Sequence, residues 1–151
     1  MAISPPTPHE TEETSRFLQA MWQFNRALGQ ELQPLLQDAH DTDPRSFMLL
    51  KTIESGLTYP KVIAQELKLP PTLLSRYLDD LSKRGLLERH IDEQDSRRTR
   101  LSLTPAGEAL LQATQCTVHT HVARRLARLR PEQLRALNDA LHALNSGEEQ
   151  A

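Results

Sequence analysis

Residues 95–104 constrain the fold more than any other part of the chain, because they join an arginine-rich turn to a strand pattern. Leu101 and Leu103 alternate with polar residues, as expected for a strand with one buried face. Three arginines crowd the turn: Arg97, Arg98 and Arg100. Thr104 and Pro105 then supply an N-cap and a first-position proline for a following helix. These residues alone fit two interpretations, a hairpin that contacts nucleic acid or a solvated hairpin whose arginines pair with nearby carboxylates.

The residues before this hairpin predict two helices joined by a tight connection. The longer helix has apolar residues at i, i+3, i+4 and i+7: Leu74, Tyr77, Leu78 and Leu81. It stops at Gly85, which follows two basic residues, as a helix C-terminal glycine often does. A shorter helix is predicted over residues 60–69, and residues 86–91 fit a strand that could pair with residues 100–103. The predicted order is a helix-turn-helix followed by a wing.

The rest of the chain predicts helices on both sides of this core. Residues 1–9 are proline-rich and are expected to be a disordered tail, followed by a helix over residues 10–37 that Pro34 kinks or ends. Asp43 and Pro44 open another helix, and two more helices follow the hairpin, from residue 105 to about 129 and from 131 to about 145. The terminal helices carry more apolar surface than one small core can cover. An isologous two-fold dimer would bury that surface.

Composition excludes several other classes of protein. The 151 residues suit a single domain, and the 4% aromatic content favours a mostly helical chain. The net charge of −2 does not by itself indicate nucleic-acid binding, so the clustering of the arginines matters more. No apolar run approaches the roughly 18 residues of a membrane span. The single cysteine, Cys116, fits a reducing cytoplasm and is expected to be a small buried apolar residue.

Enzyme and metal chemistry also lack support in the sequence. There is no glycine-rich phosphate loop, nucleophile motif or catalytic carboxylate pair, and the six histidines show no metal-ligand spacing. We therefore expect no enzyme activity, no catalytic residues, no cofactor and no metal. The remaining alternatives are a DNA-binding regulator and a winged-helix module that binds other proteins.

The ordered set of motifs resembles the MarR-type family of bacterial and archaeal winged-helix transcription regulators. The matching positions are Ile63, Ala64, Leu67, Leu69, Ser75, Arg76, Leu81, Lys83, Gly85, Leu86, Arg89, Asp95, Arg97, Leu103, Thr104 and Gly107. The motifs cover residues 43–111, and the other segments agree only in helical layout. Four positions depart from the pattern: Lys68 replaces a frequent Gly, Pro70 a frequent Ser or Asp, Leu73 a frequent polar residue and Ser96 a frequent Arg.

The resemblance implies a mainly α fold with a small β-hairpin wing, as one domain over residues 10–151. Residues 43–104 would form the winged helix-turn-helix, and residues 10–40 and 106–146 the dimerisation helices. The implied function is a cytoplasmic, homodimeric regulator of transcription that binds palindromic double-stranded DNA, and in particular a repressor. The recognition helix would read the major groove through Thr72, Leu73, Ser75 and Arg76. The wing would use Asp95, Arg97, Arg98 and Arg100, with Asp95 orienting Arg97 by a bidentate contact.

The resemblance further implies release of the DNA by a small phenolic or anionic effector, bound between the dimerising helices and the winged core. The residues expected to line that pocket are Met21, Trp22, Arg26, Phe47 and Met48. Trp22 fits the hydrophobic core of a dimer interface as well as it fits an effector contact. An effector could act only if it bound one dimer geometry more tightly than the other.

Overall fold

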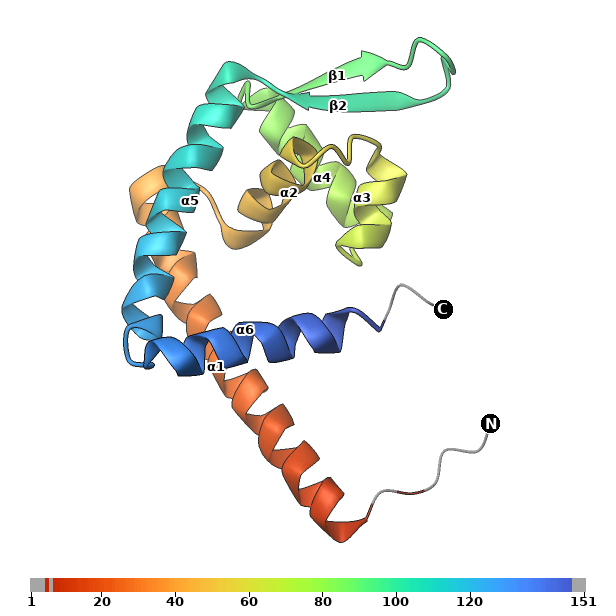
Figure 1. The fold of residues 1–151 in the computed structure, drawn as a ribbon. Helices are drawn as coiled ribbons and strands as arrows, with labels where there is room; N and C mark the ends of the chain where they lie inside the picture. The colour runs from red at the N-terminus through yellow and green to blue at the C-terminus, as the bar shows by residue number, and fades with distance from the viewer. Residues whose placement is uncertain (1–4, 6, 148–151) are drawn as a thin grey trace. The chain divides into compact units, whose positions relative to one another are not determined.

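The computed structural model describes Pro5 and residues 7–147. Within that part of the chain, six helices accompany one two-stranded antiparallel hairpin, so the predicted mainly helical fold with a wing is confirmed (Figure 1). The elements are α1 Pro8–His40, α2 Pro44–Glu54, α3 Pro60–Glu66, α4 Pro71–Lys83, β1 Leu87–Ile91, β2 Thr99–Leu103, α5 Pro105–Leu126 and α6 Pro131–Asn145. The chain divides into two compact units, residues 1–111 and 112–151.

The first helix is longer at both ends than its sequence pattern predicted. Thr7 caps it, because the Thr7 hydroxyl accepts the Glu10 N–H at 3.3 Å and the Glu10 carboxylate accepts the Thr7 N–H at 2.8 Å. The Thr7 N–H and, at 2.7 Å, the Thr7 hydroxyl both donate to Oε2 of Glu10, and these two hydrogen bonds lower the pKa of Glu10. The helix thus includes Pro8 and His9, which the sequence analysis assigned to a disordered tail; most of that tail, residues 1–4 and 6, lies outside the described residues.

Pro34 does not end α1, which continues to His40. A proline removes one hydrogen bond from a helix, but Leu36, in the turn after it, is fully buried and anchors this part of the helix in the core. The helix ends at Asp41, which has a left-handed φ of 50° and donates its N–H to the Gln37 carbonyl at 3.1 Å. The expectation that Pro34 ends α1 is therefore wrong, because burial of the following turn outweighs the loss of one helix hydrogen bond.

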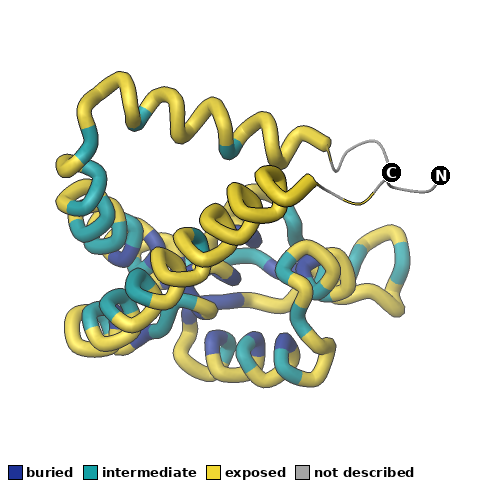
Figure 2. The backbone as a smooth tube through the Cα atoms, turned by 90° about the horizontal axis from the view of Figure 1, so that it is seen from below, coloured by how far each residue is buried: buried dark blue, intermediate teal, exposed yellow. Residues whose placement is uncertain are grey.

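The core of the first unit joins the helix-turn-helix to the hairpin. Its fully buried side chains are Leu36, Leu49, Leu50, Ile63, Leu81, Leu101 and Leu111, and they correspond to dark blue positions in Figure 2. The Asp43 side chain caps α2 by accepting the Ser46 N–H at 2.8 Å, as the sequence predicted. The hairpin is tied to this core by a hydrogen bond of 2.8 Å from the Leu101 N–H to the Thr58 carbonyl.

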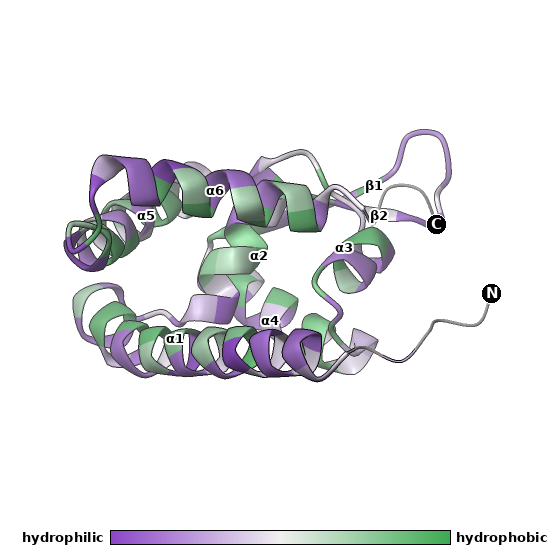
Figure 3. Cartoon of the chain, turned by 60° about the horizontal axis from the view of Figure 1, so that its bottom comes forward, coloured by the Kyte–Doolittle hydropathy of each residue, from purple (hydrophilic) through white to green (hydrophobic). Residues whose placement is uncertain are grey.

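The second unit buries few side chains of its own. No residue of α6 is buried, although the helix carries hydrophobic residues, which are green in Figure 3. Leu137 and Leu144 of α6 are exposed. Cys116 on α5 is exposed, so the expectation of a buried cysteine is wrong for the single chain. A helix with apolar residues and no buried face is typical of a surface that another chain covers.

Candidate nucleic-acid interface

The connection between α3 and α4 has an unusual backbone conformation at Lys68. Its φ is +50°, in the left-handed region that residues with a Cβ seldom adopt. Lys68 is also the position where the sequence departs from the glycine expected in this connection. The turn is closed by a hydrogen bond of 3.0 Å from the Leu69 N–H to the Ala64 carbonyl. Two prolines then begin α4, whose N-cap residue Pro70 makes no side-chain capping bond.

The four residues predicted for the recognition helix lie together in the N-terminal half of α4. Thr72, Ser75 and Arg76 are exposed and Leu73 is half-buried, because the opposite face carries Leu74, Leu78 and Leu81 into the core. Among the described residues Arg76 has no ion pair. The nearby carboxylates are engaged elsewhere: Asp79 pairs with Arg89 of β1 at 2.6 Å, and Asp80 lies 3.8 Å from Arg84. The outer face of α4 therefore presents hydroxyl and guanidinium donors.

The hairpin has a regular register that separates the wing tip from its strands. Leu87 pairs with Leu103 and Ile91 with Thr99, which leaves residues 92–98 as the connecting loop. That loop is closed by a hydrogen bond of 3.0 Å from the Asp92 N–H to the Arg98 carbonyl. Only Asp92 and Asp95 of the loop are partly buried. The loop is consequently shaped by polar contacts rather than by an apolar core.

Asp95 orients the arginines of the tip, but not by the bidentate contact that the sequence predicted. Its Oδ1 accepts both the backbone N–H of Arg97 at 3.1 Å and the Nε–H of Arg97 at 3.3 Å. The other oxygen, Oδ2, lies 3.8 Å from Nε of Arg98. The Asp95 carboxylate therefore contacts two arginines. Its Oδ1 binds Arg97, and its Oδ2 faces Arg98. The Arg97 side chain remains 90% exposed.

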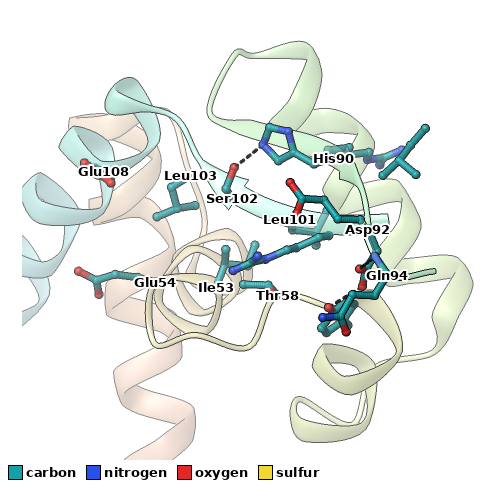
Figure 4. Close-up of a pocket in the computed structure, with 15 residues that line it drawn as sticks. Ile53, Glu54, Thr58, His90, Asp92, Gln94, Leu101, Ser102, Leu103 and Glu108 are labelled. Carbon is teal, nitrogen blue, oxygen red and sulfur yellow. Dashed lines mark hydrogen bonds between the residues drawn. The ribbon is translucent and has the colours of Figure 1, made fainter. Parts of the chain in front are cut away.

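Arg100 lies apart from these tip residues. It is within β2, opposite His90 of β1, and it lines an open groove along the hairpin together with Ile53 and Glu54 of α2 (Figure 4). In the same groove His90 Nε2 lies 2.9 Å from the Ser102 hydroxyl. The structure thus brings Asp95, Arg97 and Arg98 together, and places Arg100 on a strand.

The charge of the wing is balanced rather than basic. Residues 87–103 contain four arginines, Arg89, Arg97, Arg98 and Arg100, and four carboxylates, Glu88, Asp92, Glu93 and Asp95. Three of the four arginines have a carboxylate within 4 Å. Because the positive and negative charges of the wing are equal in number, the wing exerts little long-range attraction on a DNA phosphate. At close range, a phosphate would have to compete with the carboxylates that already pair with three of the arginines.

Tyr59 is a contact of the wing that sequence reasoning missed. Its hydroxyl donates to Asp92 Oδ2 at 2.7 Å, and the Arg98 guanidinium lies 5.8 Å from the centre of its ring. This hydrogen bond lowers the pKa of Asp92 and raises the pKa of Tyr59. The two residues are 33 positions apart in sequence, so no local pattern could have paired them.

None of the five residues predicted for an effector pocket lines either of the two best-defined cavities in the described part of the chain. One cavity is the groove along the hairpin, and the other lies where α1, α2 and α4 meet. Phe47 is buried, but the exposed fractions of Met48 and Trp22 are 45% and 68%. Met21 is half-buried and Arg26 is exposed. The pocket remains a prediction, and in the single chain Trp22 lies outside the core.

The region just described matches a known protein family. Residues 40–98 match the model of the MarR family. Over these residues the chain is similar to the MarR family. The match includes α2, α3, α4, β1 and all of the wing loop, so the resemblance inferred from the sequence is confirmed there.

Solved structures of two other proteins share the fold over most of the chain. The transcriptional regulator BldR from Sulfolobus solfataricus superposes with a TM-score of 0.76 at 20% identity, over 89% of this chain and 98% of that one. A cysteine-to-serine mutant of MarR from E. coli, complexed with operator DNA, gives a TM-score of 0.74 at 22% identity, over 87% and 95% of the two chains. Identities this low show a common fold.

The described residues form neither a membrane-spanning helix nor a metal-binding cluster. No helix among them is both long and apolar enough to span a bilayer. They also contain no group of three or more histidine, cysteine or acidic side chains arranged to hold a metal ion.

Proposed function

We propose that this chain is a homodimeric transcription regulator that binds double-stranded DNA in a sequence-specific manner, through α4 in the major groove and the wing beside it. The observation that carries the proposal is the donor-rich outer face of α4, where Thr72, Ser75 and Arg76 are exposed. The similar fold of E. coli MarR, whose mutant was crystallised with operator DNA, supports the same placement. As a regulator of this kind it would act in the cytoplasm, where bacterial and archaeal DNA lies.

Binding to a duplex from the gene's own upstream region tests this proposal. Arg97→Ala should weaken operator binding by about 1–3 kcal/mol if the side chain enters the minor groove or contacts a phosphate. Arg16→Ala is a matched control, because Arg16 is an exposed arginine that pairs with carboxylates on α1. Equal affinity of the parent for the upstream duplex and a scrambled duplex would contradict sequence-specific recognition.

Arg76 should determine part of that specificity. A guanidinium that binds a guanine edge contributes about 1–3 kcal/mol to discrimination between bases. Arg76→Ala should therefore narrow the difference in affinity between operator and scrambled DNA. An equal loss on both duplexes would instead make Arg76 a phosphate contact.

The proposed dimer accounts for apolar side chains that the single chain leaves in solvent. On α1 these are Phe17, Leu18, Trp22 and Phe24, and on α6 they are Leu137 and Leu144. An isologous interface could cover both sets and would place two recognition helices about 34–36 Å apart, one DNA turn. Sedimentation velocity should give the dimer mass, and Leu144→Asp should shift the equilibrium towards monomer. A parent that is monomeric while bound to a palindromic operator would contradict this arrangement.

Repression and release by a small phenolic or anionic effector complete the proposal. Trp22 is the only tryptophan and therefore reports on the predicted pocket of Met21, Trp22, Arg26, Phe47 and Met48. Titration with salicylate-like anions should change its fluorescence and raise the dissociation constant for DNA over the same concentration range. A fluorescence change without loss of DNA affinity would contradict release by the effector.

One observation favours a second candidate, a winged-helix module that binds protein. The wing has no excess positive charge, and Ile91 at its edge is 74% exposed. If this candidate were correct, the parent would bind neither duplex even at low salt, where phosphate contacts are strongest.

A further inference from the structure

Tyr59 lies at a position whose backbone is held on both sides. Pro60 follows it and restricts it to an extended conformation, with φ −102° and ψ 127°. The residue before it, Thr58, accepts the Leu101 N–H of β2 at 2.8 Å. The tyrosine therefore projects from a point that is fixed relative to both α3 and the hairpin.

The contacts of Tyr59 reach the two ends of the wing loop. Asp92 is the first residue after β1, and Arg98 is the last residue before β2. The Tyr59 hydroxyl donates to Asp92 Oδ2 at 2.7 Å, and the ring lies beneath the Arg98 guanidinium at 5.8 Å. The remaining oxygen of Asp92, Oδ1, accepts the Gln94 N–H at 2.9 Å, which fixes the carboxylate.

Arg98 remains available to a ligand despite these contacts. Its side chain is 67% exposed, and its partner carboxylate, Asp95, is at the long distance of 3.8 Å. A flat aromatic face restricts where a guanidinium can lie without using up its N–H donors. Such a contact reduces the conformational freedom that the arginine would lose on binding a phosphate.

We propose that Tyr59 is a positioning residue for the wing, which ties the loop to the helix-turn-helix through Asp92 and holds Arg98 ready to contact the DNA backbone. This inference rests on the proposed function. It assigns Tyr59, which lies outside both the recognition helix and the wing, to the DNA-binding machinery. Tyr59 acts through Arg98 and does not itself touch DNA.

Three variants separate the two contacts that Tyr59 makes. Tyr59→Phe removes the hydrogen bond to Asp92 and keeps the ring, Tyr59→Leu removes both, and Arg98→Ala removes the arginine. Tyr59→Phe should weaken operator binding about threefold to tenfold, the net effect expected for loss of one typical hydrogen bond, and Tyr59→Leu should weaken it further. Ser102→Ala is the matched control, because it removes a 2.9 Å hydrogen bond to His90 from the same hairpin.

The double variants Tyr59→Leu/Arg98→Ala and Tyr59→Phe/Arg98→Ala test whether the ring acts through the arginine. Tyr59→Leu should bind operator more weakly than Tyr59→Phe when Arg98 is present, but the two should differ by less than about twofold in the Arg98→Ala background, since residues that act through one another are not additive. Full additivity would overturn the proposal. So would a Tyr59→Phe variant that binds operator as tightly as the parent, or a Ser102→Ala variant with the same loss as Tyr59→Phe.

A measurement without DNA distinguishes failure of this inference from failure of the proposed function. Nitrogen relaxation of the Arg98 side chain by NMR should show greater mobility in Tyr59→Leu than in the parent. Equal mobility in the two proteins would overturn the positioning role whatever the DNA result. If mobility increases as expected but the parent binds neither duplex, then the proposed function fails, and the role of Tyr59 in DNA binding fails with it.

Discussion

Gly107 offers the sharpest test of how the wing is joined to the rest of the chain. It lies in the first turn of α5 and is buried against the backbone of Leu86, immediately before β1. A Cβ added at residue 107 would overlap the Leu86 carbonyl oxygen and lie 3.0 Å from its carbonyl carbon. Because the obstructing atoms belong to the backbone, no side-chain rotation can relieve the overlap. The start of α5 would have to move away from β1.

The cost of Gly107→Ala follows from what holds this junction together. Thr104 donates its N–H to the Leu86 carbonyl at 3.2 Å and its hydroxyl to the Gly85 carbonyl at 2.6 Å. Overpacking costs about 1–3 kcal/mol, and weakening each of two hydrogen bonds adds about 0.5–1.5 kcal/mol. We therefore expect a loss of roughly 2–6 kcal/mol, a large part of the ~5–15 kcal/mol that stabilises a typical domain. The melting temperature should fall by at least about 4 °C.

Thermal and urea unfolding followed by circular dichroism would measure this loss. Gly29→Ala is the matched control, because Gly29 lies inside α1 and an added Cβ there meets nothing within 4 Å. The control should stabilise the protein by about 0.5–1 kcal/mol, since alanine is the better helix former. A Gly107→Ala protein that melts within about 2 °C of the parent would refute the argument from close backbone approach.

Three further predictions concern single side chains. Lys68→Gly should raise the free energy of unfolding by about 0.5–1 kcal/mol, because glycine adopts the left-handed φ of +50° without strain; a decrease in urea unfolding would contradict this. Asp43→Ala should cost about 0.5–2 kcal/mol by removing the cap of α2, and Asp43→Asn, an equally good cap, should retain most of the stability in the same assay. The Asp92–Tyr59 contact should be stable at neutral pH and be lost only as the pH falls through an Asp92 pKa below 3.8, because the tyrosine hydroxyl favours the carboxylate. The Gln94 amide signal should report that midpoint by NMR, and Tyr59→Phe should move it up towards 3.8.

Features fixed by neighbouring residues were predicted well from the sequence. Asp43 and Pro44 open α2, Thr104 and Pro105 open α5, and Gly85 takes a positive φ of 71° after α4. Each of these signals depends on the backbone geometry of three or four consecutive residues. The leucine spacing of α4 likewise predicted the face that the structure buries.

Features fixed by distant residues were predicted poorly. Pro34 was expected to kink or end α1, but the helix continues to His40, and Leu36 in the turn after the proline is fully buried. The burial of Cys116 was predicted from residue type, but the structure leaves its side chain exposed. Tyr59 was not assigned to the wing, because Asp92 lies 33 positions away. Burial and long-range contacts depend on parts of the chain that the local pattern does not describe.

The sequence by itself determined the order of the elements, their caps and the exposed donors of α4, because helix periodicity and capping depend on residues within a few positions of one another. The tertiary structure alone decided how the wing is held. Tyr59 meets Asp92 and Arg98, Asp79 meets Arg89, and Gly107 lies against Leu86 only once the chain has folded. These contacts join residues that the sequence separates by 10 to 39 positions, and their geometry is set by the packing of α2, α3 and α4 against the hairpin.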